Sequence, residues 1–156
     1  MNPQGNLFRN SPLKIIVLCQ IFLLSSQAVS ANEDRIGLVK TFTPSATLIR
    51  EGKELNVGMG SQIHEGDTIA TSSDGTLGII FSDGSVLTLG PSAKIIIDDF
   101  TFNLTENKFS FLSQILEGTV VFLSGAIGKI SPGSIHFKTP DTTLGLRGTK
   151  IVIEVD

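Results

Sequence analysis

The stretch TPDTTLGLRGT at residues 139–149, which continues as KIVIEV at residues 150–155, is the part of the chain least like a generic β-sheet sequence. Pro140 has no N–H to donate to a neighbouring strand, so the chain should turn there. Two leucines then alternate with a glycine, and Gly148 supplies a flexible point after Arg147. The last six residues alternate again as a closing strand. This stretch therefore predicts three short strands separated by two changes of direction.

The chain between residue 32 and this stretch has the same character, with short apolar bursts, many Gly, Ser and Thr residues, and no tryptophan or tyrosine. No long window keeps a helical period, so the sequence predicts an all-β domain of many short strands joined by glycine turns. The even spacing of the strands fits either a β-sandwich or a solenoid-like stack of β-turns. Residues 114–117 could form one helical turn, and no other segment here is expected to be helical. Strands are expected at Gly37 to Phe42, Ala46 to Arg50, Glu54 to Val57, Thr68 to Thr71, Thr76 to Phe81, Ser85 to Leu89, Lys94 to Ile97, Phe100 to Leu104, Phe109 to Leu112, Thr119 to Leu123, Ile135 to Thr139, Thr143 to Leu146 and Lys150 to Val155.

The hairpin between residues 76 and 89 can be predicted to the level of register, because the register decides which residues face the core. A two-residue loop would set Ile79 opposite Thr88 and would mix apolar and polar residues on one face. A three-residue loop at residues 82–84, with Gly84 in the left-handed conformation, avoids this mixture. We therefore predict pairing of Ile79 with Leu87 and of Leu77 with Leu89.

The first 31 residues have the pattern of a helical secretory signal peptide. Arg9 and Lys14 are their only charged residues, an apolar run follows from Ile15 to Leu24, and Val29 and Ala31 are the small residues that a signal peptidase requires. Cleavage is expected after Ala31, which leaves residues 32–156 as a single periplasmic or secreted domain. The apolar run is well short of the roughly 20 residues that span a bilayer, so no stable membrane span is expected after cleavage.

Composition excludes several classes of function. The one cysteine, Cys19, lies in the predicted signal peptide, so the exported part should have neither a disulfide nor a thiolate ligand. That part carries 10 basic and 15 acidic residues, a formal charge of −5, whereas nucleic-acid binding calls for a basic face.

The two histidines are candidates for metal binding or general base catalysis, but neither has suitable neighbours in sequence. No cysteine and no H-E-x-x-H spacing accompanies His64 or His136. His136 also alternates with two apolar residues in a predicted strand, so its side chain should face solvent. We expect no catalytic residue, no metal and no cofactor, and we expect that the protein is not an enzyme.

Acidic residues beside glycines are expected to be turn residues, because a carboxylate accepts hydrogen bonds from turn amides. Asp98 and Asp99 follow an isoleucine run, and together with Asp67 and Asp83 they could in principle form a carboxylate pair or a calcium site. Such sites need a set separation in a cleft or six or more oxygen ligands, and the spacing dictates neither. A turn or strand-end position is the expectation for these residues.

Arg147 is the charged residue that stands out, because its neighbours are apolar or small. A guanidinium in such surroundings can hold backbone carbonyls or a carboxylate with its five N–H groups. We expect Arg147 to pin the closing strands to a turn elsewhere, through Asp67 or Asp83. Recognition of an anionic ligand is the alternative.

Four segments, read in order, resemble the FecR domain family. They are Val39 with Leu48-Ile49-Arg50-Glu51-Gly52, Gly60 with Ile63-His64-Glu65-Gly66-Asp67-Thr68-Ile69-Ala70-Thr71, Phe81-Ser82-Asp83-Gly84-Ser85 with Leu87 and Leu89-Gly90, and Lys138-Thr139-Pro140 with Arg147-Gly148-Thr149. The resemblance covers nearly all of the chain after the signal peptide. It implies a periplasmic β domain in which the motif residues have structural roles, namely Gly66, Asp67, Thr68, Asp83, Gly84, Thr139, Pro140, Arg147, Gly148 and Thr149.

The regulator branch of that family combines a cytoplasmic region that contacts a sigma factor, one membrane helix, and this domain facing a TonB-dependent receptor. This chain differs from that plan, because we expect only a signal peptide before the domain and no further module after it. The resemblance therefore implies an all-β envelope domain similar to many stand-alone or multi-domain FecR modules. Because the motif residues are turn and strand residues without a catalytic arrangement, we expect a stand-alone protein that binds or scaffolds an unknown envelope protein or polymer. An accessory sensor or regulator of TonB-linked, ferric-citrate-type uptake is the alternative.

Overall fold

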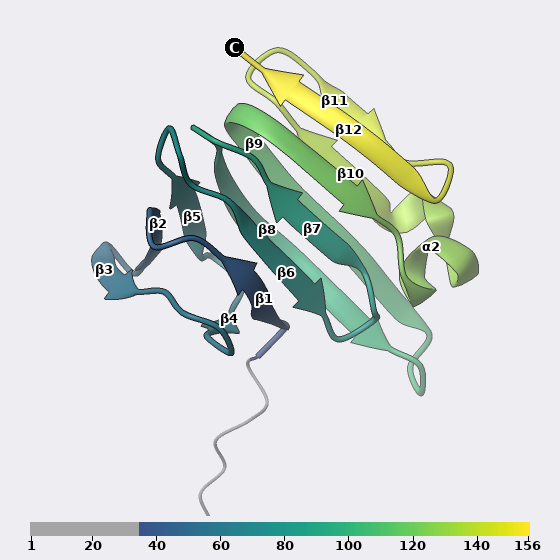
Figure 1. Cartoon of the computed structure of the whole chain (residues 1–156). Coiled ribbons are helices and arrows are strands. Elements are labelled where there is room, and N and C mark those ends of the chain that lie inside the picture. The colour runs from purple at the N-terminus through teal and green to yellow at the C-terminus, as the bar shows by residue number, and fades with distance from the viewer. Residues whose placement is uncertain (1–34) are drawn as a thin grey trace, which may run out of the picture. The chain divides into compact units, whose positions relative to one another are not determined.

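The computed structural model describes residues 35–156, which form an all-β domain (Figure 1). The predicted signal peptide, its cleavage site and residues 32–34 lie outside the described residues. The elements are β1 (Gly37–Phe42), β2 (Ala46–Arg50), β3 (Lys53–Asn56), β4 (Gln62–Ile63), β5 (Thr68–Thr71), β6 (Leu77–Phe81), β7 (Val86–Leu89), β8 (Lys94–Asn103), β9 (Lys108–Leu123), α2 (Ala126–Ile130), the 3-10 turn η1 (Pro132–Ser134), β10 (Ile135–Lys138), β11 (Thr143–Gly145) and β12 (Lys150–Val155).

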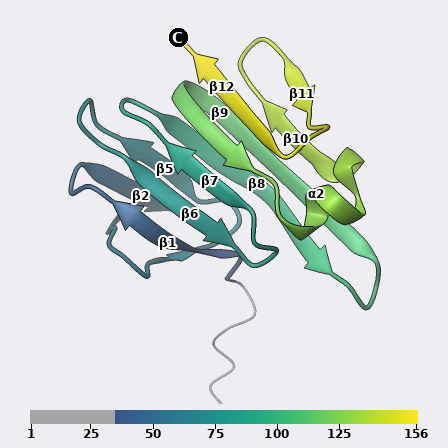
Figure 2. The ribbon, with the colours of Figure 1, turned by 45° about the vertical axis from the view of Figure 1, so that its right-hand side comes forward.

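The strands form one curled sheet whose two layers share the long strand β9 (Figures 1 and 2). The first part of β9 pairs with β8 and β10, in a layer that continues from β8 through β5 and β2 to β3. The second part pairs with β7 and β12, in a layer that continues from β7 through β6 and β1 to β4. Every pair is antiparallel except β10 with β9. Antiparallel layers of this kind agree with the sandwich expectation rather than with a solenoid.

Gly118 marks the place where β9 passes from one layer to the other. Its φ of 81° is a left-handed conformation that glycine adopts without steric cost. A Cβ at this position would lie 2.4 Å from the Cα of Ala93 and 2.5 Å from the carbonyl oxygen of Ser92. The absence of a side chain therefore allows both the bend and the close approach of the neighbouring chain.

An aromatic cluster fills the space between the layers, with Phe111 of β9 at its centre. The ring centroid of Phe111 lies 5.0 Å from Phe81 and 4.8 Å from Phe122, which belong to the layer of β6 and β7. It lies 6.0 Å from Phe100 and 5.6 Å from Phe137, which belong to the layer of β8 and β10. Edge-to-face and tilted aromatic pairs at these separations are favourable beyond their burial. The cluster therefore holds the two layers together.

The predicted hairpin register is confirmed. Leu77 pairs with Leu89 and Ile79 pairs with Leu87, and Gly84 has a φ of 81°. The turn closes with a 3.0 Å hydrogen bond from the Gly84 N–H to the Phe81 carbonyl oxygen. The alternation of apolar residues, together with one glycine, was sufficient to define the loop length.

The closing stretch also folds as predicted, into β10, β11 and β12 with a turn at Pro140 and a second change of direction before Lys150. The Thr139 N–H donates to the Thr142 carbonyl oxygen across the first turn at 2.8 Å. At the second, the Ser124 hydroxyl donates to the Gly148 carbonyl oxygen at 3.1 Å, and the Ser124 N–H to that of Thr149 at 2.9 Å.

Other expectations were wrong in detail. The segments predicted at 94–97 and 100–104 form the single strand β8, and those at 109–112 and 119–123 form the single strand β9. The predicted helical turn at 114–117 is therefore extended, because these residues lie in β9 opposite β8, with a register shift between the Ile95–Ile115 and Lys94–Glu117 pairs. The short helix α2 and the turn η1, which follow β9, lie where only loops were expected.

Candidate binding site around Arg50 and Asp67

Asp67 lies at the end of the His64–Asp67 turn and is fully buried at the start of β5. Gly66 takes the left-handed conformation that the turn requires, with a φ of 80°. The Gly66 N–H donates to the Ile97 carbonyl oxygen at 2.7 Å, and the Ile97 N–H donates to the Asp67 carbonyl oxygen at 3.1 Å. The turn is thus held against β8 by main-chain hydrogen bonds, with the Asp67 side chain on the inside.

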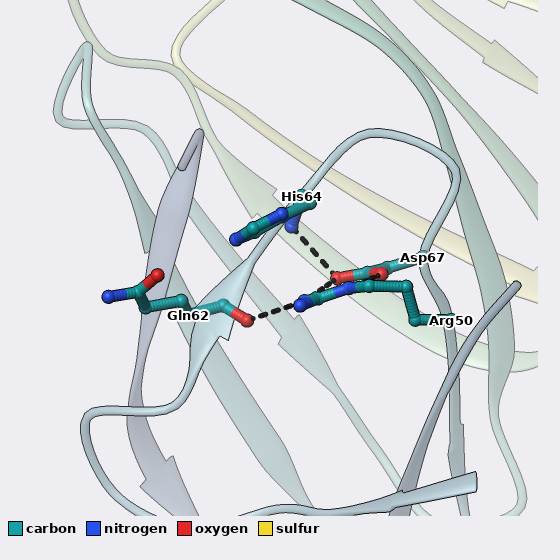
Figure 3. A network of polar contacts seen from close by, with 4 residues as sticks. All are labelled: Arg50, Gln62, His64 and Asp67. Carbon is teal, nitrogen blue, oxygen red and sulfur yellow. Dashed lines mark hydrogen bonds and ion pairs between the residues drawn. The ribbon is translucent and has the colours of Figure 1, made fainter. Parts of the chain in front are cut away.

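Arg50, the last residue of β2, binds the Asp67 carboxylate in a bidentate ion pair (Figure 3). Arg50 Nε donates to Oδ1 at 2.7 Å and Nη2 donates to Oδ2 at 2.8 Å. Nη2 also donates to the Gln62 carbonyl oxygen at 3.0 Å, and the His64 N–H donates to Asp67 Oδ2 at 2.8 Å. The network therefore joins β2, β4 and β5, which are separate segments of the chain.

The two side chains of this pair bring opposite charges into direct contact. The hydrogen bonds that Arg50 donates to the Asp67 carboxylate raise the pKa of the guanidinium, against a smaller opposing effect of its partial burial. Because an arginine side chain is already protonated at physiological pH, this upward shift of its pKa keeps Arg50 charged. A carboxylate removed from water needs such a partner, since an unpaired buried charge is costly.

A shallow pocket of about 170 Å³ opens beside this ion pair. Its walls combine apolar and polar side chains, from Leu48, Leu55 and Val57 and from Arg50, Asn56, Ser61 and Gln62. Within residues 35–156, Arg50 uses three of its five N–H groups and Nη1 makes no hydrogen bond. Because Asp67 already compensates the positive charge, a neutral acceptor such as a peptide carbonyl suits this pocket better than a free anion.

The two histidines do not form a metal site with other residues in the described part of the chain. Across residues 35–156 no three His, Cys, Asp or Glu side chains are grouped so that they could hold a metal ion. Nε2 of His64 is buried and has no hydrogen-bond partner within that range. His136 is exposed on β10, as the alternation predicted.

Asp83, in the other glycine turn, is buried and serves as a cap for the helix α2. Its Oδ1 accepts from the Ser85 N–H at 2.9 Å, and its Oδ2 accepts from the Ser85 hydroxyl at 2.7 Å and from the Ile127 N–H at 3.2 Å. The Ser85 hydroxyl oxygen in turn accepts from the Gly125 N–H at 2.9 Å. A Cβ on Gly125 would lie 2.4 Å from the Asp83 carbonyl oxygen, so the helix start rests directly on the hairpin.

Asp98 and Asp99 lie inside β8, and the expectation of a turn or strand end was wrong. The ladder with β9 shifts register between Ile97 and Asp99, which marks an irregularity at this point. Asp98 Oδ1 accepts a hydrogen bond from Gln114 at 2.8 Å, and Asp99 accepts one from the Ser110 hydroxyl. Each of the four aspartates named from the sequence is thus bound by different partners.

Arg147 does not hold Asp67 or Asp83, contrary to the expectation from sequence. Its side chain is exposed, and it forms neither an ion pair nor a side-chain hydrogen bond with any residue from 35 to 156. The preceding Leu146 is buried, so alternation along the segment turns Arg147 outward. The arginine that binds Asp67 is Arg50, which sequence reasoning placed in a strand without assigning it a partner.

Together these features define the class of protein, an all-β domain in which buried acidic turn residues bind groups from separate segments of the chain. The sequence model of the FecR protein family matches residues 67–156, more than half of the chain, and the chain belongs to the FecR family. Members of this family are associated with the cell envelope. The chain matches no curated protein and no solved structure at the significance that we required.

The matched segment begins at Asp67 and includes the hairpin loop and the closing stretch, whereas Arg50 precedes it. Among the helices of residues 35–156, none has the length and apolar character needed to cross a membrane.

Proposed function

We propose that this protein is a non-enzymatic envelope protein, exported by a cleaved signal peptide to the periplasm or beyond, that binds an extended segment of another envelope protein. The observation that carries the proposal is the unpaired edge of β3 beside the pocket that Arg50 lines. The family assignment supports the envelope setting. The motif residues are proposed to hold this surface in shape rather than to react.

The β3 edge has the features of a site for strand addition. β3 pairs with β2 on one side, and no strand within residues 35–156 pairs with its other side. All four of its residues are exposed, and Leu55 also forms part of the pocket wall. In strand addition, main-chain hydrogen bonds give affinity and an adjacent pocket selects a side chain. The pocket, with its apolar walls and the free Nη1 of Arg50, would accept a side chain or a carbonyl group of the added strand.

The non-enzymatic part of the proposal rests on what the acidic side chains already do. A general acid or base must reach a substrate, and its pKa is usually tuned by its site. Asp67 is engaged by Arg50 and by a backbone amide, and Asp83 is engaged by Ser85 and by the start of α2. These contacts support structural roles for both residues.

Affinity capture from an envelope fraction tests the proposal. The exported chain is cross-linked in the fraction, and the proteins bound to it are identified by mass spectrometry. The same experiment is done with the variant Leu55→Asp, which places a charge in the pocket wall. Leu104→Asp is the matched control, because Leu104 is also exposed but lies in the turn after β8. The same partner should be recovered with the wild type and with Leu104→Asp, and lost with Leu55→Asp.

Equal recovery of the partner with all three proteins, or no recovery with any of them, would refute the proposal that the β3 edge is the binding site. Captured material that resists protease but is released by glycosidases would show a polymer partner and would overturn the choice of a protein.

An accessory sensor or regulator role in TonB-linked iron uptake is the second candidate, and membership of the FecR family favours it. A gene for a sigma factor or a TonB-dependent receptor beside the gene for this protein would support it. Deletion of the gene should then change iron-responsive transcription. An unchanged transcriptional response to ferric citrate would count against this role.

A further inference from the structure

The last strand, β12, leaves one edge unpaired and carries a self-complementary pattern on it. β12 pairs antiparallel with β9, from Lys150 opposite Leu123 to Val155 opposite Gly118. No other strand of residues 35–156 pairs with β12. An exposed edge of this kind presents free N–H and C=O groups to any strand that fits it.

Hydrogen bonds at both edges of β9 show which main-chain groups of β12 are free. The Gly90 N–H donates to the Thr119 carbonyl oxygen at 2.9 Å. The main-chain N–H and C=O groups of every second residue of β9, starting at Thr119, therefore point toward β7. The main-chain groups of the alternate residues of β9 point toward β12. The 2.9 Å hydrogen bond from the Ser124 N–H to the Thr149 carbonyl oxygen agrees with this pattern. Because antiparallel pairs alternate in this way, the main chain of Lys150, Val152 and Glu154 points to the free edge.

The side chains of these same three residues lie on the exposed face of the strand. Val152 is 58% exposed, which is high for a valine in a strand, whereas Ile153 next to it is buried. Lys150 and Glu154 have opposite charges and lie at equal distances along the chain from Val152. Charges on an edge strand normally block pairing with other strands. Here a second β12 strand running in the opposite direction can pair without placing like charges opposite one another, because each lysine would lie opposite a glutamate.

We propose that β12 pairs antiparallel with β12 of a second copy of this chain, centred on Val152. In that register Val152 faces Val152 of the other copy, and each Lys150 faces Glu154 across the two-fold axis. All three free residues then form hydrogen-bonded pairs, giving about six new main-chain hydrogen bonds. Two opposite-charge pairs and one apolar pair lie on the exposed face, which is the side-chain pairing that stabilises antiparallel strands. The layer that contains β12, β7, β6 and β1 would continue into the second copy.

Charge reversal tests this pairing in the full exported chain. Lys150→Glu or Glu154→Lys places like charges opposite one another twice per dimer, so each should weaken self-association about tenfold in sedimentation equilibrium. The double variant Lys150→Glu/Glu154→Lys should restore it, and so should an equimolar mixture of the two single variants. Lys53→Glu, on the exposed edge strand β3, is the matched control and should have no effect.

Cross-linking tests the register independently of charge. The exported chain is expected to have no cysteine of its own, so Val152→Cys introduces a single thiol. This variant should form a disulfide-linked dimer, because facing residues of a hydrogen-bonded pair have Cα atoms about 5.5 Å apart, within disulfide range. Glu154→Cys should not cross-link, because the two copies of that residue lie roughly 13 Å apart in this register. Three results would overturn the proposal. They are a chain that sediments as a monomer at every concentration, a dimer unaffected by Lys150→Glu, and cross-linking through residue 154 instead of residue 152.

This inference is independent of the partner proposed for β3. Leu55→Asp should leave self-association unchanged, and Lys150→Glu should leave capture of an envelope partner unchanged. The two proposals therefore fail separately.

Discussion

Replacing Arg50 with alanine should destabilise the protein more than replacing Asp67 with alanine does. Arg50→Ala leaves the Asp67 carboxylate buried, with the His64 N–H as its remaining side-chain hydrogen bond. Removing one partner of a buried ion pair costs about 3–5 kcal/mol. Asp67→Ala leaves Arg50, whose side chain is 29% exposed and can turn toward water, so we expect a smaller cost of about 2 kcal/mol.

The double variant separates the energy of the Arg50–Asp67 interaction from the energies of the other contacts that each side chain makes. Arg50→Ala/Asp67→Ala removes both charges together, so its cost should be close to that of Arg50→Ala alone and should imply a coupling energy of about 2 kcal/mol. Chemical denaturation gives these free energies of unfolding, and the melting temperature of Arg50→Ala should fall by roughly 10 °C.

Arg147→Ala is the matched control, since it removes the same side chain from an exposed position without an ion pair in residues 35–156. It should leave the free energy of unfolding unchanged. Additive effects of Arg50→Ala and Asp67→Ala, or a larger loss with Arg147→Ala than with Arg50→Ala, would refute the reasoning.

Three further substitutions probe the rest of the framework by denaturant unfolding. Gly118→Ala should cost more than 3 kcal/mol, because the new methyl group would overlap Ala93 in a left-handed backbone position, whereas Gly58→Ala, with open space around it, should be close to neutral. Asp83→Ala should cost about 1–3 kcal/mol, because the first amides of α2 and the turn lose their acceptor; an unchanged stability would show that the cap is dispensable. Phe111→Ala should cost about 3–5 kcal/mol, because it empties the centre of the aromatic cluster; a loss below about 1 kcal/mol would place the stabilising core elsewhere.

Most strand positions could be predicted from sequence because alternation and glycine act locally. The limits of β1, β2, β5 and β12 agree with the expected segments, and the hairpin loop was defined by a single mismatch between Ile79 and Thr88. The expected strands at 94–97 and 100–104 proved to be one strand, β8, because the local pattern at Asp98 and Asp99 predicted a break between them. In the structure, a register shift and hydrogen bonds from β9 allow both aspartates to lie within β8.

The helix α2 was missed because its stabilising contacts come from far along the chain. It has five residues, too few for a helical period to be visible, and its cap is Asp83, which is 44 residues from Ile127. An isolated helix of this length is unstable in water. Only the folded hairpin makes its position favourable.

The partner of Asp67 was misassigned, although a signal for the correct one was present. Arg50 lies two residues after Leu48 in the same strand, so both side chains share a face, and Leu48 is buried. A charge on the apolar face of a strand requires a partner, and this was a stronger reason for pairing than the apolar neighbours of Arg147. Which carboxylate would meet it depends on the pairing of β2 with β5, and local pattern does not determine that pairing.

The position of β9 has a consequence for how the polypeptide reaches its native state. Neither layer can be completed until residues 108–123 have been synthesised, since both layers contain that one strand. Distant strand pairings of this kind slow folding, because long loops must close before any contact rewards them. Because β9 belongs to both layers, we expect them to form together, and loss of β9 pairing in one layer should weaken the other as well.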